Sequence, residues 1–175
     1  MKMSIPVKQV AAVHDLSSFG RTSLSVVIPI LSTMGFKVCP LPTAVLSSHT
    51  RYQGYHFVDL TNHLQPIIDH WQKLKISFSA IYSGFLGSHQ QIKIVQELIE
   101  KFKNEELLVV VDPVLGDNGQ KYGTITGKMV EEMRSLIQMA DLITPNLTEA
   151  SLLLNEPYSE TLENGELKSW ILRLA

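Results

Sequence analysis

Short apolar segments alternate with amphipathic segments along almost the whole chain. Five runs are rich in Val, Ile and Leu, at residues 9–14, 37–43, 79–84, 107–112 and 141–144. Several of these runs are apolar on both alternating faces, as is usual for strands that helices cover on both sides. The alternation predicts a doubly wound α/β fold, in which a mostly parallel sheet with right-handed crossovers is flanked by helices.

The segments between these runs have the features of helices. Helical spacing of apolar residues is found in residues 23–35, 60–74, 88–103, 126–140 and 147–154. Ser88 is expected to be an N-cap and Gly35 a C-terminal stop. Pro29 is expected to kink its helix or to mark the first turn. The polar segment 155–165 is expected to be a surface loop.

Composition favours one globular domain spanning residues 1–175 and excludes several kinds of partner. Apolar residues make up 45% of the chain, and the net charge of −2 offers no basic field for nucleic acid or an anionic membrane. No apolar run is long enough to span a bilayer. The opening residues MKMSIPVKQ contain no long apolar run, so we expect no signal peptide. Cys39, the only cysteine, is expected to be buried in a strand and fits a reducing, cytoplasmic location.

The last residues, GELKSWILRLA, are typical of a helix without a C-terminal stop signal. The apolar side chains of Trp170, Ile171, Leu172 and Leu174 need a surface to cover them. Two explanations stay open: either they dock on the core, or the natural protein continues beyond Ala175. We expect the second, so that the domain is incomplete at its C-terminus.

Polar or glycine-containing turns follow each predicted strand. These turns contain HDLSSFGR, PTAVLSSHTRY, SGFLGSH, DPVLGDNG and TPNLTEA. Ligands of doubly wound sheets bind outside the carboxyl ends of the strands, so the turns are expected to meet at one ligand-binding edge.

Three carboxylates at this edge suggest a Mg²⁺-phosphate site. Mg²⁺ favours one or two carboxylates together with phosphate oxygens and water. Asp112 ends an apolar strand, where a carboxylate must be hydrogen-bonded or paired, and a functional role is favoured there. Asp117 fits a turn-capping role about equally well. Glu149 alone fits a helix N-terminus better than a ligand role.

Other residues and motifs indicate what kind of ligand this edge could bind and which kinds it could not. His49 lies in a polar ligand-side loop, and contact with a ligand is favoured over a plain surface role. Phe19, Tyr52 and Phe85 are more often core residues, but together they could flank a flat ring. GTITGK is one residue too short for a P-loop, and neither G-x-G-x-x-G nor G-x-S-x-G occurs.

The motifs FGRTSL, PLPTAVLSSHTRY, YSGFLGS, DPVLGDNGQKYG and DLITPNLTEA, in this order, resemble those of the vitamin B6 (pyridoxal and pyridoxamine) kinases of the ribokinase-like superfamily. The resemblance runs from about Val10 to Leu154. It implies the N-terminal portion of a ribokinase-like fold and ATP-dependent phosphorylation of the 5′-hydroxymethyl group of a B6 vitamer. It also implies Mg²⁺, a monovalent cation such as K⁺, and a homodimer.

The resemblance also implies roles for individual residues. The residues implied to surround the vitamer are Asp15, Ser17, Thr43, His49 and Phe85. The residues implied to bind ATP and its phosphates are Asp112, Asp117, Tyr122, Asn146 and Glu149, and of these Asp112 and Glu149 are implied to bind the metal.

Two departures from the family's pattern qualify these expectations. Related kinases often carry serine where Asp15 stands, and an aspartate there leads to the hypothesis that the protein prefers pyridoxamine to pyridoxal. The family's Gly-Thr-Gly-Asp turn, which supplies an anion hole and the general base, has no match in these 175 residues. We therefore expect the base to lie beyond Ala175 and this chain alone to be inactive or nearly so.

Three other interpretations stay open. The first is a kinase of the same superfamily acting on hydroxymethylpyrimidine. The second is a non-catalytic domain that binds the vitamer. The third is a flavodoxin-like fold with an unrelated role, which fits the order of elements but leaves the order of motifs unexplained.

Overall fold

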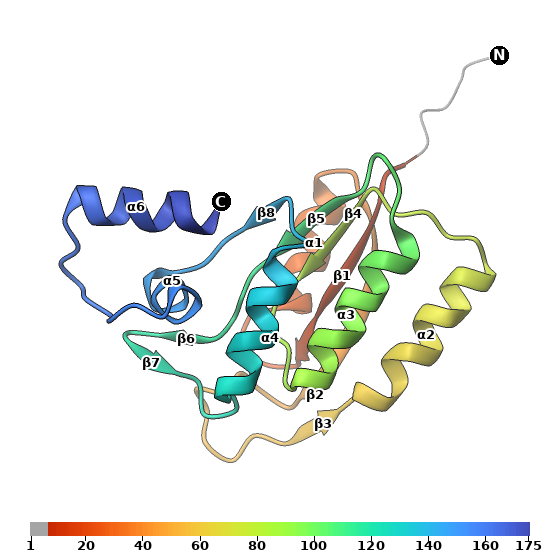
Figure 1. Cartoon of the computed structure of the whole chain (residues 1–175). Coiled ribbons are helices and arrows are strands. Elements are labelled where there is room, and N and C mark those ends of the chain that lie inside the picture. The colour runs from red at the N-terminus through yellow and green to blue at the C-terminus, as the bar shows by residue number, and fades with distance from the viewer. Residues whose placement is uncertain (1–6) are drawn as a thin grey trace.

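The computed structural model describes residues 7–175, and residues 1–6, the first part of the stretch expected to lack a signal peptide, lie outside this range. A six-stranded sheet has the order β3-β2-β1-β4-β5-β8 (Figure 1). Only β3 runs antiparallel to its neighbour. The strands of this sheet are β1 (Gln9–Ser17), β2 (Lys37–Leu46), β3 (Phe57–Asp59), β4 (Ala80–Ser83), β5 (Leu108–Val111) and β8 (Leu142–Ile143). The predicted doubly wound fold is confirmed.

Helices follow the strands as the alternation predicts. They are α1 (Leu24–Thr33), α2 (Thr61–Lys73), α3 (His89–Phe102), α4 (Gly127–Ile137), α5 (Leu147–Leu154) and α6 (Asn164–Leu174). The Ser88 side chain accepts a hydrogen bond from the Gln91 amide, which confirms it as the N-cap of α3. Pro29 lies inside α1 rather than in its first turn.

The main core lies between the sheet and the layer formed by α2, α3 and α4 (Figure 1). Each of these helices directs an apolar stripe at the strands, represented by Leu64, Ile92 and Met133, which are almost completely buried. Ile81 and Val111 face them from the centre of the sheet. Burial of apolar area on this scale is the main force that stabilises the fold.

Helix α1 covers the opposite face and differs from the other layer. It contacts β1 and β2, yet only Leu24 of its ten residues is buried. Ile30 is 53% exposed and Met34, just past the helix, is 65% exposed. No charged residue occurs between Leu24 and Gly35. An apolar helix surface therefore faces outward.

Several local features were not predicted from the sequence. The short strand β3 and the hairpin of β6 (Gly116–Asp117) and β7 (Gln120–Lys121) were missed, because strands of two or three residues leave little periodicity. Cys39 lies in β2 as expected but is only partly buried, so the expectation of a buried residue was wrong. The predicted loop 155–165 ends slightly early, since α6 begins at Asn164.

The apolar residues of α6 are only partly covered. Trp170 is buried and Leu174 packs on the edge of the core, whereas Ile171 and Leu172 are exposed. Docking on the core thus covers two of the four apolar residues that need a surface, Trp170 and Leu174. Among residues 7–175, no helix has both the length and the apolar character that crossing a bilayer requires.

Gly84 and Gly87 provide a matched test of packing at the end of β4. A Cβ atom on Gly84 would lie 2.1 Å from Nδ1 of His14, whereas on Gly87 the nearest atom, Oε1 of Gln91, would be 3.6 Å away. The His14 ring is held by an edge-to-face contact with Tyr82 and cannot easily move. We expect Gly84→Ala to lower the free energy of unfolding by about 1–3 kcal/mol and Gly87→Ala to lower it much less, as measured by urea denaturation. Equal losses would contradict this account.

Candidate active site

Five turns meet at the carboxyl edge of the parallel strands, as the sequence predicts. They form two neighbouring groups. The first group consists of Asp15 and Ser17 at the end of β1, with His49 and Phe85 in the turns after β2 and β4. The second group consists of Asp112 and Asn146 in the turns after β5 and β8, with Glu149 in the first turn of α5. The sheet order places β1 and β4 between β2 and β5, so the two groups lie side by side along one edge.

Glu149 organises the acidic group. It forms a capping box with Asn146: the Asn146 side chain accepts from the Glu149 amide, and Glu149 Oε2 accepts from the Asn146 amide at 2.8 Å. Its other oxygen, Oε1, accepts from the Leu115 amide at 3.2 Å. The Asn146 side chain also donates to the Gly116 carbonyl. The start of α5 is therefore fastened to the loop that follows β5.

Burial and a second carboxylate change the pKa of Glu149. The side chain is 4% exposed. Desolvation is the largest cause that raises its pKa to about 7; the backbone hydrogen bonds oppose the rise, and the negative charge of Asp112 adds to it. This coupling requires the two carboxylates to be close, as expected for a shared phosphate or metal site.

Asp112 and Tyr122 belong to the same cluster. Asp112 is half-buried, accepts a hydrogen bond from the Thr144 hydroxyl at 3.2 Å, and has its pKa raised by desolvation. The pKa of Tyr122 is raised by burial and then by Asp117, Glu149 and Asp112. The structure thus brings together the residues that were expected around ATP.

Asp117 also has a structural role, as considered from the sequence. Its carboxylate accepts from the backbone and side-chain nitrogens of Asn118. Asn118 and Gly119 both have positive φ, at 50° and 74°, and make the two-residue turn between β6 and β7. Asp117 is exposed at the rim of the cluster, so a role in nucleotide binding stays a prediction.

The acidic group suits a metal that a ligand also helps to hold. Among residues 7–175, no three His, Cys, Asp or Glu side chains gather closely enough to bind an ion by themselves. Both oxygens of Glu149 already accept backbone hydrogen bonds, whereas Oδ2 of Asp112 accepts none from residues 7–175. Asp112 is therefore the better direct ligand, and Glu149 contributes charge beside it. Phosphate oxygens and water would complete the coordination.

Asp15 is the central polar residue of the second group. It is 5% exposed, and each of its oxygens accepts one hydroxyl: Ser17 Oγ lies 3.0 Å from Oδ2 and Ser23 Oγ lies 2.5 Å from Oδ1. The register between β1 and β2 shifts between His14 and Leu16, so Asp15 falls at an irregularity of the strand. The involvement of Ser23 was not predicted.

His49 and the turn after β1 are in close contact. The His49 amide donates to the Phe19 carbonyl, and a Cβ on Gly20 would lie 2.8 Å from the His49 Cβ. His49 Nδ1 accepts from the Arg51 amide at 3.0 Å, so the proton of the neutral ring is on Nε2, which can donate to a ligand. The expected contact of His49 with a vitamer stays a prediction.

A hydrogen bond joins Thr43 to the backbone of Phe85. Thr43 is completely buried and its hydroxyl donates to the Phe85 carbonyl at 3.1 Å. Gln91 reaches from α3 to the Thr43 carbonyl. Thr43 thus positions the Phe85 turn, and its expected direct contact with a ligand stays a prediction. Phe19 and Tyr52 lie 5.4 Å apart at the rim of the same edge and are exposed.

His14 was missed because nothing in the sequence distinguishes a strand histidine next to a site from a core histidine. It is almost completely buried, and burial lowers its pKa to about 4, so the ring is neutral. Its Nε2 atom has no hydrogen-bond partner among the described residues.

Thr144 was also not predicted. The sequence did contain a signal for it, since Thr144 lies at the end of a predicted strand, next to the turn that carries expected site residues.

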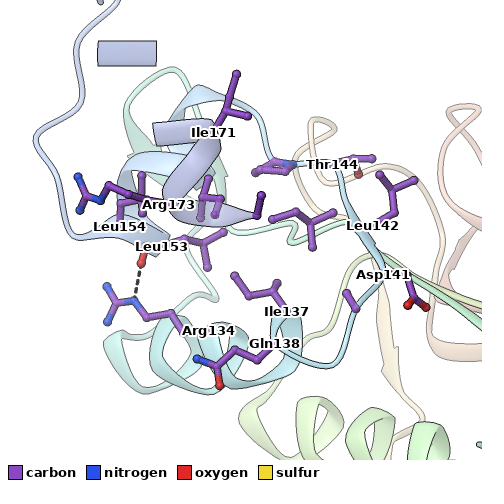
Figure 2. Close-up of a pocket in the computed structure, with 15 residues that line it drawn as sticks. Arg134, Ile137, Gln138, Asp141, Leu142, Thr144, Leu153, Leu154, Ile171 and Arg173 are labelled. Atoms are coloured by element: carbon purple, nitrogen blue, oxygen red, sulfur yellow. Dashed lines mark hydrogen bonds between the residues drawn. The ribbon is translucent and has the colours of Figure 1, made fainter. Parts of the chain in front are cut away.

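A hollow on the described surface lies outside the edge that holds these residues. Its volume is about 850 Å³. Figure 2 shows it between α4, β8 and α6, with Ile137, Leu142, Leu153 and Ile171 around it. The Arg134 side chain donates a hydrogen bond to the Leu153 carbonyl. Among the candidate cluster, only Thr144 lines it. It is mainly an apolar groove beside the outer strand, whereas the polar chemistry lies at the strand ends.

Comparison with known proteins identifies the family. The model of the phosphomethylpyrimidine kinase family matches residues 32–174. The chain belongs to this family. The match covers most of the sheet and the whole acidic group, and the family is consistent with the resemblance to the vitamin B6 and hydroxymethylpyrimidine kinases stated from the motifs.

Relatives and solved structures agree with this assignment. The pyridoxal kinase of Dictyostelium discoideum is 32% identical over 129 residues, which cover 70% of this chain and 42% of that protein. A pyridoxal kinase of Aliivibrio fischeri is 28% identical over 84% of this chain and 53% of its own length. The chain therefore spans about half the length of the curated relatives that it matches.

Two solved structures share the whole described fold. A Bacteroides thetaiotaomicron protein, provisionally described as a phosphomethylpyrimidine kinase, is 55% identical with a TM-score of 0.95, over 99% of this chain and 60% of that one. Pyridoxal kinase from Lactobacillus plantarum is 36% identical with a TM-score of 0.89, over 97% of this chain and 60% of that one. The ribokinase-like fold is thus shown.

The raised pKa of Glu149 leads to a prediction about pH and stability. The folded protein holds this proton up to about pH 7, whereas the unfolded chain releases it near its ordinary value of 4.5, so the folded state binds more protons between these values. Stability contributed by Glu149 is therefore present at low pH and is lost as the pH rises towards 7. His14 acts in the opposite sense, but only between its folded pKa of about 4 and its ordinary 6.5.

The test is urea denaturation between about pH 5 and about pH 8, in which the wild type is compared with Glu149→Gln so that the contribution of His14, which both proteins share, cancels. We expect the free energy of unfolding of the wild type, taken relative to that of Glu149→Gln at the same pH, to fall as the pH rises through 7. Glu131→Gln, on the exposed face of α4, is the control and should behave like the wild type. The same slope in all three proteins would contradict the assignment.

Proposed function

We propose that this chain provides the vitamer-binding and nucleotide-binding edge of an ATP-dependent kinase that phosphorylates the 5′-hydroxymethyl group of B6 vitamers. The observation that carries the proposal is the placement of two polar groups on one sheet edge. One is the acidic cluster of Asp112 and Glu149, and the other is formed by Asp15, Ser17 and His49. Phosphoryl transfer depends mainly on positioning and on neutralising charge, and this arrangement suits both requirements.

The roles of the two groups follow from their chemistry. Asp112 would hold Mg²⁺, with Glu149 beside it, and the ion would neutralise charge on the transferred phosphoryl group. Asn146 and Tyr122 would complete the phosphate side, together with Asp117 and a monovalent cation such as K⁺. His49 can donate from Nε2 to the vitamer, and Phe85 offers a ring beside it. A cytoplasmic location is part of the proposal and is supported by the single, unbridged cysteine.

Transfer itself also needs a base on the attacking hydroxyl. No Gly-Thr-Gly-Asp sequence occurs in these 175 residues, and the matched relatives are about twice as long. We propose that the base belongs to residues of the longer relatives that have no counterpart in this chain. The chain would then bind both ligands without turning them over.

A second candidate is a kinase of hydroxymethylpyrimidine. It is favoured by the name of the family model and by the provisional description of the Bacteroides protein. Against it, the same Bacteroides protein, 57% identical to this chain, was solved with pyridoxal in its orthorhombic form. Titration with pyridoxal and with hydroxymethylpyrimidine separates the two candidates, since the proposal requires tighter binding of the vitamer.

Calorimetry on the 175-residue chain tests the proposed function. We expect binding of a B6 vitamer and of Mg²⁺-ATP, and no ADP release in a coupled assay. Asp112→Asn should weaken Mg²⁺-ATP binding about tenfold, because one charge of the metal site is lost, and should leave vitamer binding unchanged. Glu131→Gln is the charge-matched control. Loss of vitamer binding in Asp112→Asn, or no binding by the wild type, would overturn the proposal.

Normal ADP release by the chain would overturn the expectation about the base. In a longer protein that contains the missing turn, binding of both ligands without turnover would instead favour the non-catalytic binding domain.

We also propose that the protein forms a homodimer through the outward face of α1. That face combines exposed Ile30 and Met34 with no charge from Leu24 to Gly35, while α2, α3 and α4 carry charged residues. An uncharged, apolar surface packs favourably against another surface without charge. In a two-fold symmetric dimer the second copy presents the same face of α1 and so supplies such a surface. The Ser32 hydroxyl can both donate and accept across a two-fold axis, whereas the Ser25 and Thr33 hydroxyls already donate to the Thr22 and Pro29 carbonyls and can only accept there.

The dimer surface is tested by introducing a charge. We expect Ile30→Glu to convert a dimer into a monomer in size-exclusion chromatography with light scattering, since symmetry brings two like charges into one apolar interface. Leu74→Glu is the matched control, because Leu74 is 58% exposed and follows α2 on the opposite layer. A monomeric wild type, or an Ile30→Glu dimer, would contradict the proposal.

A further inference from the structure

The carboxylate of Asp15 is buried without a cationic side chain beside it. The ion pairs among residues 7–175 use Asp69, Glu132 and Glu156, and none of them involves Asp15. Its two contacts are the hydroxyls of Ser17 and Ser23, which are neutral donors. A buried carboxylate is usually paired with a cation or held by several donors, and each of its oxygens can accept more than one hydrogen bond. The site can therefore take a further, cationic donor.

The Ser23 hydroxyl is directed to Asp15 at the expense of its usual role. Serine at the N-cap of a helix normally accepts a hydrogen bond from an amide of the first turn. Ser23 precedes α1 in the N-cap position, yet its side chain makes no cap hydrogen bond and donates to Asp15 instead. The helix begins with only the Ser23 carbonyl accepting from the Val26 and Val27 amides.

The backbone of this turn is also in an unfavourable conformation. Gly20, Arg21 and Ser23 have φ values of 115°, 36° and 53°. A side chain makes this left-handed region unfavourable, and such residues cluster at ligand clamps and active sites. Arg21 and Ser23 are the strained residues of this turn, since glycine adopts a positive φ freely, and the same turn delivers Ser23 to Asp15 and contacts His49 through Gly20. The strain therefore lies where the proposed ligand would be held.

These observations identify what could complete the site. An aldehyde or hydroxymethyl substituent on a small aromatic ring carries no positive charge. A primary amine on the same ring is an ammonium group at neutral pH, with several N–H donors for a carboxylate whose two oxygens are already fixed. We propose that Asp15, clamped by Ser17 and Ser23, is a subsite for the ammonium group of an aminomethyl-substituted ring, and that Ser23 is the residue that positions Asp15 for it. The inference rests on the proposed function and names pyridoxamine as the vitamer that it favours.

The decisive variant is Ser23→Gly, because glycine adopts a φ of 53° without strain. It removes the hydroxyl and leaves the backbone at least as stable. Calorimetry should show about tenfold weaker binding of pyridoxamine and less than about twofold change for pyridoxine, in a protein that is still folded at the temperature of the measurement. Lys75→Gly is the matched control, since Lys75 also has a φ of 53° and lies far along the chain, between α2 and β4. It should change neither affinity.

A double-mutant cycle shows whether Ser23 acts through Asp15. Asp15→Asn should lower pyridoxamine affinity more than pyridoxine affinity, and Ser23→Gly added to it should change the ratio of the two affinities no further. A merely structural role for Ser23 would weaken both vitamers equally in either background, and this result would refute the subsite.

The remaining outcomes separate this inference from the function on which it rests. If the wild type binds pyridoxine or pyridoxal, but Asp15→Asn leaves the preference between amine and alcohol unchanged, the subsite is refuted and the proposed function stands. If the wild type binds no vitamer at all, both are refuted. A selective loss for pyridoxamine in Ser23→Gly and Asp15→Asn, absent in Lys75→Gly, supports the subsite.

Discussion

The carboxylate of Glu149 holds together the part of the molecule on which the proposed chemistry depends. Through backbone hydrogen bonds it joins the first turn of α5 to the loop after β5, and these segments come from different crossover units. The parallel sheet brings the strand ends to one edge, but it does not fix the loops beyond them. The capping box performs that second task, and it places a buried charge beside Asp112 at the same time. One interaction thus determines both the shape and the electrostatics of the acidic group.

The two buried carboxylates of the site are stabilised in different ways. Glu149 accepts backbone amides, and desolvation together with Asp112 shifts its titration towards neutral pH. Asp15 accepts two serine hydroxyls, one on each oxygen. A cation bound together with phosphate would lower the pKa of Glu149, because it would relieve the repulsion between Glu149 and Asp112. The arrangement around Asp15 fixes the direction of a carboxylate and leaves its charge for a ligand. The sheet edge therefore presents two buried carboxylates, one held by backbone amides and one by serine hydroxyls.

Most of the fold could be predicted from the sequence, because each core strand has a run of apolar residues and each helix has a periodic face. Ser88 also shows that a capping signal can be recognised directly. The site was predicted less completely. Asp112, His49 and Glu149 lie at strand ends or helix starts, where topology alone places them, and the family resemblance added roles that spacing could not give. Ser23 was missed because its contact depends on positive φ values in a short turn, and His14 was missed because burial without a partner is a tertiary property.

The two edges of the sheet differ in a way that affects how the sheet can grow. On one side the antiparallel strand β3 ends the parallel order and carries Asp59 in a short exposed segment. On the other, β8 runs parallel to β5 and has no strand on its outer side within residues 7–175, and its Leu142 is half exposed beside an apolar groove. Backbone groups along such an open margin can template a new strand. Any extension of the sheet, by the same polypeptide or by a foreign one, would therefore add next to β8, and mispaired aggregates should nucleate there first.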